Sequence, residues 1–134
     1  MQVAQVGAAF AAADPAAAGA WSAEHLGFEL LVDLGRYVST RPADHEALRV
    51  DFVRHDHESW PEPGARVAGA LLALVVPDVD AQHERWVAGG IAVLTPLGTE
   101  PWGQRRVQVA GPDGLVIELV QPDPEWMAAN GLSA

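Results

Sequence analysis

The stretch from Trp102 to Gln121, WGQRRVQVAGPDGLVIELVQ, decides the fold of this chain. It predicts a β-hairpin, because two runs rich in β-branched residues flank the turn sequence Gly111-Pro112-Asp113-Gly114. Glu118 is the unusual residue, since it is a carboxylate in the middle of an otherwise apolar strand. The two-residue period of a strand places it on the face opposite to Ile117 and Leu119. It therefore needs a partner, a metal, a ligand or water, because an unpaired buried charge is costly.

The composition limits the class of protein. At 134 residues the chain has room for one compact domain with a real core, and its 49% apolar content argues against disorder. No apolar run approaches the roughly 18 residues that a membrane-spanning helix needs. The alanine-rich start contains Asp14-Pro15 and no basic leader, which argues against a signal peptide. Because the chain also lacks cysteine, we expect a cytoplasmic protein without a membrane partner.

The formal net charge of −10 disfavours nucleic acid as a partner, because a phosphate backbone is attracted to basic surfaces. The same charge gives only weak support for a cationic ligand, since many soluble proteins are acidic. The charge therefore removes nucleic acid from the expected partners and identifies no other partner.

Two segments of the chain follow the same pattern. Asp14 and Asp78 each open a predicted helix as its N-terminal cap, and Gly27 and Gly90 follow the helix ends. Matching residues lie about 63 to 65 positions apart. The predicted helices cover residues 16–25 and 81–88. The predicted strands cover residues 2–10, 28–34, 37–40, 48–55, 67–76 and 91–94, and the two strands of the hairpin follow.

This self-similarity predicts two copies of one β-α-β-β-β unit. We expect an α+β fold in which module one covers about residues 2–60 and module two about residues 66–121. A short tail, residues 122–134, follows the second module. Because a sheet unit of this size cannot cover its own apolar face, each copy must pack on another copy.

Several short segments together match the pattern of a known family: Asp14-Pro15, Leu26-Gly27-Phe28, and residues 76–81, 101–105, 111–114 and 117–119. With this spacing the chain resembles the vicinal oxygen chelate superfamily, which groups glyoxalase I, extradiol dioxygenases, fosfomycin-modifying enzymes and bleomycin-binding resistance proteins. The resemblance implies a single domain, residues 1–134, whose two modules curl their mixed sheets into a cup. It also implies a homodimer with a binding groove between the subunits, in which the partner's strands often complete each cup.

The resemblance further implies where a metal would be held. Metal-dependent members place a His, Gln or Glu on the first strand, a His or Glu at the start of the fifth strand and a Glu on the eighth. Those positions fall on Gly7, Leu71 and Glu118, so only the last is a ligand. Gln5 is the one nearby substitute for Gly7, and no side chain in residues 69–73 can ligate a metal. A catalytic zinc has about three protein ligands, so we expect neither a metal nor another cofactor.

A second place for a metal stays open as an alternative. His55 and His57 are two residues apart, so they would share a face if the strand predicted over residues 48–55 continued. The acidic neighbours Asp56 and Glu58 favour an exposed strand end instead.

Five tryptophans in 134 residues are the main pointer to an aromatic ligand. Trp60 lies in a polar loop, where it either closes over a binding site or packs on its own loop or at the dimer interface. Trp102 lies where drug-binding relatives can contact their ligand, and a structural plug above the core is the alternative. Trp21 and Trp86 fall on helix faces expected to pack on the sheets, and Trp126 is a candidate contact to the partner subunit.

Without a metal, Glu118 needs another role. Pairing with a nearby arginine is the leading one, and the candidates are Arg54, Arg105 and Arg106. A hydrogen bond to a ligand and stabilisation by water are the alternatives. No Ser-His-Asp arrangement, nucleophile elbow or phosphate-binding glycine loop has convincing spacing, so we expect no catalytic residues.

The leading hypothesis is metal-independent binding and sequestration of a bulky aromatic natural product, as in the bleomycin-resistance branch of the family. The expected stacking groups are Trp60 and Trp102. The expected apolar walls are Phe28, Leu30, Phe52 and Leu71, and the expected polar contacts are Arg54, Gln108 and Glu118. One alternative is a small accessory domain that binds a metabolite. The other is a metal-dependent lyase, dioxygenase or transferase, with ligands drawn from Glu118, Gln5, His55 and His57.

Overall fold

A computed structural model describes residues 1–133 of the chain. Its contacts divide the chain into two compact units, Met1–Ala68 and the residues from Gly69 onward. Each unit contains a strand, a helix and then three more strands, in the same order along the sequence. The two sheets also have the same strand order, so the second unit repeats the topology of the first.

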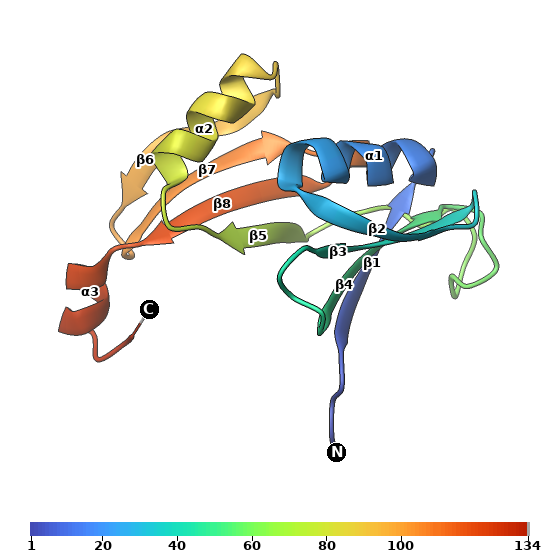
Figure 1. The fold of residues 1–134 in the computed structure, drawn as a ribbon, viewed down its shortest axis with the longest axis horizontal. Helices are drawn as coiled ribbons and strands as arrows, with labels where there is room; N and C mark the ends of the chain where they lie inside the picture. The colour runs from blue at the N-terminus through green and yellow to red at the C-terminus, as the bar shows by residue number, and fades with distance from the viewer. Residues whose placement is uncertain (134) are drawn as a thin grey trace. The chain divides into compact units, whose positions relative to one another are not determined.

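The first unit is a four-stranded mixed sheet with one helix (Figure 1). Its elements are β1 (Val6–Ala12), α1 (Pro15–Leu26), β2 (Phe28–Asp33), β3 (Tyr37–Pro42) and β4 (Leu48–Arg54). The strands lie in the order β1-β4-β3-β2. β1 runs parallel to β4, and the other neighbouring strands are antiparallel.

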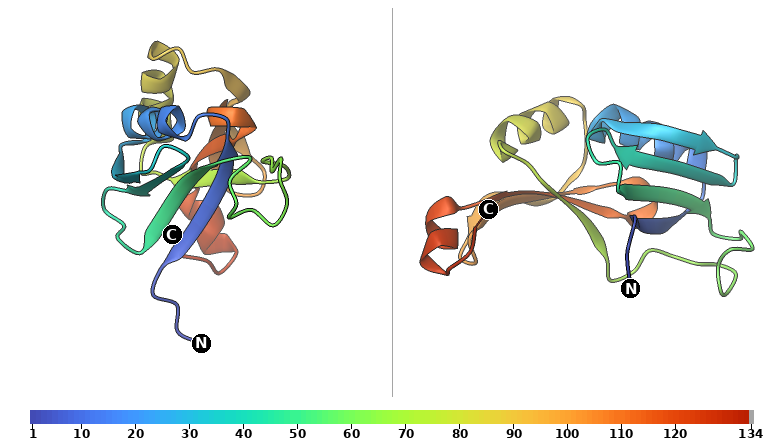
Figure 2. Two further views of the ribbon diagram at one scale, coloured as in Figure 1. Left: turned by 90° about the vertical axis from the view of Figure 1, so that its right-hand side faces the viewer. Right: turned by 60° about the horizontal axis from the view of Figure 1, so that its bottom comes forward.

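The second unit has the matching sheet order β5-β8-β7-β6, with β5 parallel to β8. Its elements are β5 (Leu71–Val75), α2 (Val79–Ala88), β6 (Val93–Glu100), β7 (Gln104–Ala110), a 3-10 turn η1 (Pro112–Gly114), β8 (Val116–Pro122) and α3 (Pro124–Ala129). Figure 2 shows α3 beyond the end of β8. In the part of the chain that the structure describes, no helix is both long and apolar enough to cross a bilayer.

The predicted fold class, α+β with two β-α-β-β-β modules, is confirmed, and the helices have the predicted caps. The carboxylates of Asp14 and Asp78 each accept a hydrogen bond from the backbone N–H three residues later, at 3.1 and 3.0 Å. Gly27 ends α1 with a φ of 67°, a left-handed conformation that favours glycine. The predicted hairpin is β7 and β8, which are antiparallel and joined by the turn at Pro112–Gly114.

Three strands differ most in extent from the prediction, and β2, β3 and β4 differ from it by one or two residues. β1 begins only at Val6, because its partner β4 begins opposite it at Leu48. β5 is shorter than predicted, since Gly69 has a φ of 67° and interrupts the extended backbone before the strand. β6 is longer than predicted, because a strand at the edge of a sheet tolerates a proline such as Pro96.

In the first unit α1 covers one face of the sheet (Figure 2). Gly19 allows a close approach, because a Cβ at this position would lie 2.8 Å from Cγ1 of Val38 and 3.8 Å from Cδ1 of Leu30. Phe52 lies opposite Val38 in the sheet register and therefore points to the same face. Asp51, one residue earlier in β4, points to the opposite face.

In the second unit α2 covers one face of the sheet in the same manner. Asp80 in the first turn of α2 binds Arg105 of β7, with 2.7 Å between Oδ1 and Nη2. Val107 shares the face of Arg105 and is completely buried. Glu118 lies opposite Gln108 in the sheet register and therefore points to the other face, away from α2.

The helix tryptophans differ in their burial. Trp86 in α2 is buried, as predicted. Trp21 in α1 was expected in the core but is only half-buried, because α1 packs on its sheet mainly through smaller residues; its ring lies 5.0 Å from that of His25. Trp126 in α3 packs against Gly103, where a Cβ would overlap the indole ring.

Candidate functional site

A pocket of about 320 Å³ lies in the first unit, on the face of the sheet that α1 leaves uncovered. Its size is at the lower end of the range of ligand pockets, about 300–1,000 Å³. Small residues of β1 form one wall, and polar side chains of β3 and β4 form another. The lining residues are Gln5, Gly7, Ala8, Ala9, Tyr37, Arg49 and Asp51.

Asp51 is the centre of the polar wall and is only 7% exposed. Its carboxylate accepts hydrogen bonds from the Tyr37 and Ser39 hydroxyls, both at 2.6 Å, and from Arg49 Nη2 at 3.2 Å. These donors compensate for the cost of burying a charge. The hydrogen bond to Asp51 raises the pKa of the Tyr37 phenol above its usual value of 10, and burial and the carboxylate charge act in the same direction.

The local sequence explains this arrangement. β4 alternates strictly, so Arg49 and Asp51 point into the pocket while Phe52 points toward α1. Ser39 of β3 lies directly opposite Asp51 in the antiparallel register, which brings its hydroxyl to the carboxylate. Tyr37 lies two residues earlier on the same strand, so its side chain points to the same face.

Glu118 of the second unit is 8% exposed and lies in a matching position. Its Oε1 atom accepts hydrogen bonds from Arg106 Nη1 at 2.8 Å and from Gln108 Nε2 at 3.1 Å. Gln108 Oε1 in turn accepts a hydrogen bond from the Thr95 hydroxyl at 2.7 Å. The Arg106 guanidinium carbon lies 5.2 Å from the ring centroid of Trp102, so the aromatic ring covers the cation.

Of the three arginines considered for Glu118, the structure selects Arg106. Arg105 points to the opposite face of β7 and binds Asp80 of α2. Arg54 belongs to the first unit and binds Asp56 through two hydrogen bonds of 2.6 and 2.7 Å. The arginine from a neighbouring strand that pairs with Glu118, as predicted, is therefore Arg106.

Asp51 was missed by the sequence analysis, although it is the counterpart of Glu118. Asp51 lies on β4 opposite Ser39, and Glu118 lies on β8 opposite Gln108. β4 and β8 take the same place in the two sheets. The available signal was the alternation in residues 48–54, in which an acid follows an arginine by two positions. The repeat thus places a buried carboxylate with a guanidinium in each unit.

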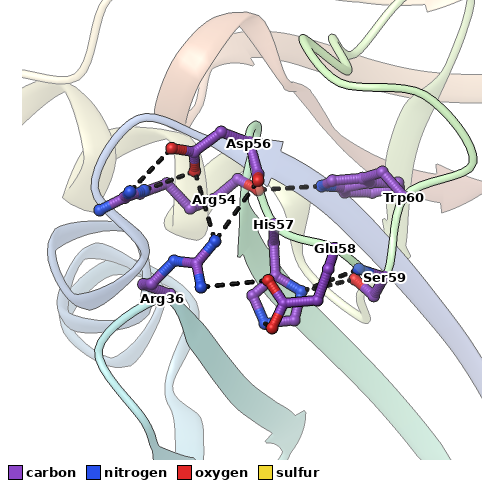
Figure 3. Close-up of polar contacts among 7 residues, drawn as sticks. All are labelled: Arg36, Arg54, Asp56, His57, Glu58, Ser59 and Trp60. Carbon is purple, nitrogen blue, oxygen red and sulfur yellow. Dashed lines mark hydrogen bonds and ion pairs between the residues drawn. The ribbon is translucent and has the colours of Figure 1, made fainter.

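A surface cluster of charges follows β4 (Figure 3). The Arg36 guanidinium lies 3.1 Å from a carboxylate oxygen of Glu58 and 3.9 Å from one of Asp56. The hydrogen bond from Arg54 lowers the pKa of the Asp56 carboxyl from 3.8 to about 2. These ion pairs hold the loop to the end of the strand.

Trp60 packs within this loop. Its indole N–H donates a hydrogen bond of 3.0 Å to the backbone oxygen of Arg54 (Figure 3). The side chain is half-buried. These are the contacts of a tryptophan that packs on its own loop, which is one of the alternatives predicted from the sequence.

A metal shared by His55 and His57 requires the strand to continue through both residues, and this condition is not met. β4 ends at Arg54, one residue before His55, so His55 and His57 do not continue the strand. His57 Nδ1 accepts a hydrogen bond of 3.1 Å from the Ser59 N–H. Its ring packs against Tyr37 with 5.9 Å between centroids, which ties the loop to the wall of the pocket.

The predicted ligand-binding residues fall into separate groups. Phe28, Leu30 and Phe52 share the face covered by α1, and Phe28 and Phe52 are buried there. Leu71 is 44% exposed and lies on β5, on the same face as Glu118. Leu71, Gln108, Glu118 and the ring of Trp102 therefore border one face of the second sheet, whereas Arg54 and Trp60 lie in the first unit.

Comparison with known proteins identifies the family. The family model of the Glyoxalase/Bleomycin resistance protein/Dioxygenase superfamily matches residues 4–119. The chain belongs to this superfamily. The resemblance inferred from the sequence motifs is thereby confirmed, and no curated protein matches the sequence.

Several solved structures have the same fold as this chain. TnmS3, an antibiotic binding protein from Streptomyces sp. CB03234, is 30% identical, with a TM-score of 0.69 over 92% of this chain and 97% of that chain. A superfamily member from Sphaerobacter thermophilus DSM 20745 is 26% identical, with a TM-score of 0.71 over 87% and 95%. Lactoylglutathione lyase from Agrobacterium tumefaciens is 22% identical, with a TM-score of 0.71 over 90% and 94%, and shares the fold.

The side chains at the superfamily's metal positions do not fit a metal ion in this chain. Gly7 has no side chain and Leu71 is aliphatic, so Glu118 is the only ligand among the three positions. Glu118 is bound by Arg106, whose positive charge repels a cation. Residues 1–133 contain no group of three or more His, Cys, Asp or Glu side chains able to hold an ion. The donor set therefore falls short of the three ligands of a catalytic zinc.

Proposed function

We propose that this superfamily member is a metal-independent binding protein that sequesters an aromatic natural product of the antibiotic class. The observation that carries the proposal is the 30% identity to TnmS3, an antibiotic binding protein, over 92% of the chain. The guanidinium beside Glu118 supports the same proposal, because it neutralises the carboxylate without a metal. Protection by such a protein is stoichiometric, since bound drug cannot reach its target.

The proposed ligand contacts are the exposed groups beside the two buried carboxylates. In the second unit, the Trp102 ring is 47% exposed and is the stacking group, with Leu71 as an apolar neighbour and Gln108 as a polar contact. In the first unit, the pocket beside Asp51 replaces the walls expected at Phe28, Leu30 and Phe52, whose face is occupied by α1. Arg54 and Trp60 stay proposed contacts at the edge of the first unit.

Titration with antibiotics tests the function. We expect bleomycin or an anthracycline to change the tryptophan fluorescence with a saturable curve. Trp102→Ala should weaken binding by about two- to tenfold, because a well-placed aromatic pair contributes about 0.5–1.5 kcal/mol beyond its buried area. The matched control is Trp21→Phe, which removes an indole from α1 and should leave the affinity unchanged.

Two results would reject this function. One is the absence of any saturable response across a broad panel of aromatic antibiotics. The other is a stoichiometric transition metal in protein purified without chelators, which would favour the metal-dependent lyase, dioxygenase or transferase. A response to ordinary metabolites alone would favour the accessory domain.

The proposal includes a homodimer, the usual assembly implied by the family resemblance. A mass of twice the 14.2 kDa chain in light scattering is the expected result. A monomer at all concentrations would contradict the dimer and leave the binding function to be tested by the titration above.

A further inference from the structure

Arg49 lines the pocket, and its guanidinium has N–H donors beyond those used in the polar wall. Its Nε and Nη2 atoms donate to the Ser39 hydroxyl at 3.2 and 2.8 Å, and Nη2 also reaches Asp51. Within residues 1–133, no hydroxyl or carboxylate accepts a hydrogen bond from the Nη1 atom of Arg49. The Arg49 side chain is 38% exposed and lines the pocket. The hydrogen bonds of Nε and Nη2 hold the guanidinium in place, and the N–H groups of Nη1 are available to a ligand.

The charge of the pocket favours a neutral acceptor. Arg49 is paired with Asp51, so the positive and negative charges of the polar wall cancel. An anionic ligand group bound to Arg49 would also lie close to the Asp51 carboxylate, and like charges at short range repel each other. A carbonyl oxygen accepts the same hydrogen bond without this repulsion. The phenol proton of Tyr37 is engaged by Asp51 and does not compete for the carbonyl.

The strand beside the polar wall leaves room for a flat ring. β1 pairs with β4 in the same sheet, with Gly7 next to Arg49 and Ala9 next to Asp51, and its pocket residues Gly7, Ala8 and Ala9 are small. A Cβ at Gly7 would have only the Cβ and backbone oxygen of Arg49 nearby, at 3.7 and 3.9 Å. These are ordinary contact distances, so a Cβ fits at this position without a clash.

We propose that the pocket of the first unit is a subsite for a planar aromatic ring system whose neutral carbonyl oxygen accepts a hydrogen bond from Arg49. This inference rests on the proposed function and adds the chemical class of the ligand. Gly7 and its alanine neighbours supply the flat wall, and Arg49 selects the carbonyl. Asp51 acts through Arg49 as a positioning residue and excludes anions.

Three probes of equal ring number test the subsite on the full chain: anthraquinone, anthracene and anthracene carboxylate. The chain has no cysteine and no lysine, so anthraquinone meets no thiol or amine side chain. We expect anthraquinone to bind at least tenfold more tightly than either other probe. Arg49→Met should abolish the preference over anthracene, whereas Arg49→Lys, which keeps the charge beside Asp51, should retain part of it.

Gly7→Val provides the second variant, because its side chain fills the pocket beside Arg49 and removes none of the pocket's polar groups. It should weaken all three probes at least tenfold with an unchanged circular dichroism spectrum. Arg85→Gln, at an exposed position of α2, removes the same charge as Arg49→Met and should change nothing. Equal binding of anthracene and anthraquinone, tighter binding of the carboxylate, or indifference to Gly7→Val would each overturn the subsite.

The subsite and the proposed function fail in different experiments. If antibiotics bind the protein and Gly7→Val leaves their affinity unchanged, the subsite is wrong and the function stands. If anthraquinone binds with the expected dependence on Arg49 and no antibiotic binds, the function is wrong and the subsite stands.

Discussion

Replacing Arg106 with leucine is expected to lower the free energy of unfolding by about 3–5 kcal/mol, the cost of removing one partner of a buried ion pair. Glu118 is 8% exposed, and Arg106 supplies the only positive charge that binds it in the described residues. After the substitution, the hydrogen bond from Gln108 remains, and it cannot neutralise the charge. Urea unfolding followed by circular dichroism measures the loss.

Two further variants separate the buried charge from other effects of this substitution. In Arg106→Leu with Glu118→Leu, much of the lost stability should return, because replacing both members of a buried pair by apolar residues is often neutral. The loss that remains includes the ion pair of Arg106 with Glu100, at 3.5 Å. Arg105→Leu removes the adjacent arginine, whose pair with Asp80 is exposed, and should cost clearly less. Equal losses in Arg105→Leu and Arg106→Leu would show that the burial of Glu118 is not the cause.

Gly103→Ala is the other substitution with a large expected effect, about 2.5–3.5 kcal/mol of lost stability or more. Gly103 has a φ of 84°, which costs an L-residue about 1–2 kcal/mol. In addition, the new Cβ would overlap the indole of Trp126, so the ring must leave its place and lose its packing, worth about 1.5 kcal/mol or more. Thermal or urea unfolding measures the total.

Gly114→Ala is the matched control, because Gly114 has a φ of 80° and no atom within 4 Å of the added Cβ. It should show the backbone cost alone. In a Trp126→Ala background, Gly103→Ala should cost about as much as Gly114→Ala, since the obstructing ring is absent. If the two glycine substitutions cost the same in the natural background, Trp126 does not pack on Gly103 as described.

The fold was predictable because its signals are local. Asp14 and Asp78 start helices by bonding N–H groups three residues away, and Gly27 ends one by its own φ. The hairpin of β7 and β8 requires only a turn between two strands that contain β-branched residues. The strand boundaries were less accurate, because the length of β1 depends on where β4 begins, about forty residues further along the chain.

The binding residues were harder to predict, because alternation fixes which side chains share a face and leaves open which face meets the helix. The apolar side of β4 was expected to meet the ligand, and the structure places α1 on it, over Phe52. The other side of β4 carries Arg49 and Asp51. From the sequence alone, these residues look like the solvent-exposed polar face of an ordinary strand. The burial of Asp51 becomes visible only once β3 supplies Ser39 and Tyr37.

The pairing of each buried carboxylate with an arginine of its own unit has an evolutionary consequence. Neither half of the chain relies on the other to balance its internal charge, because Arg49 serves Asp51 and Arg106 serves Glu118. In a duplicated ancestral half, the buried carboxylate would already have been neutralised by an arginine of the same half. After such a duplication, each copy could change its recognition chemistry without a compensating mutation in the other copy.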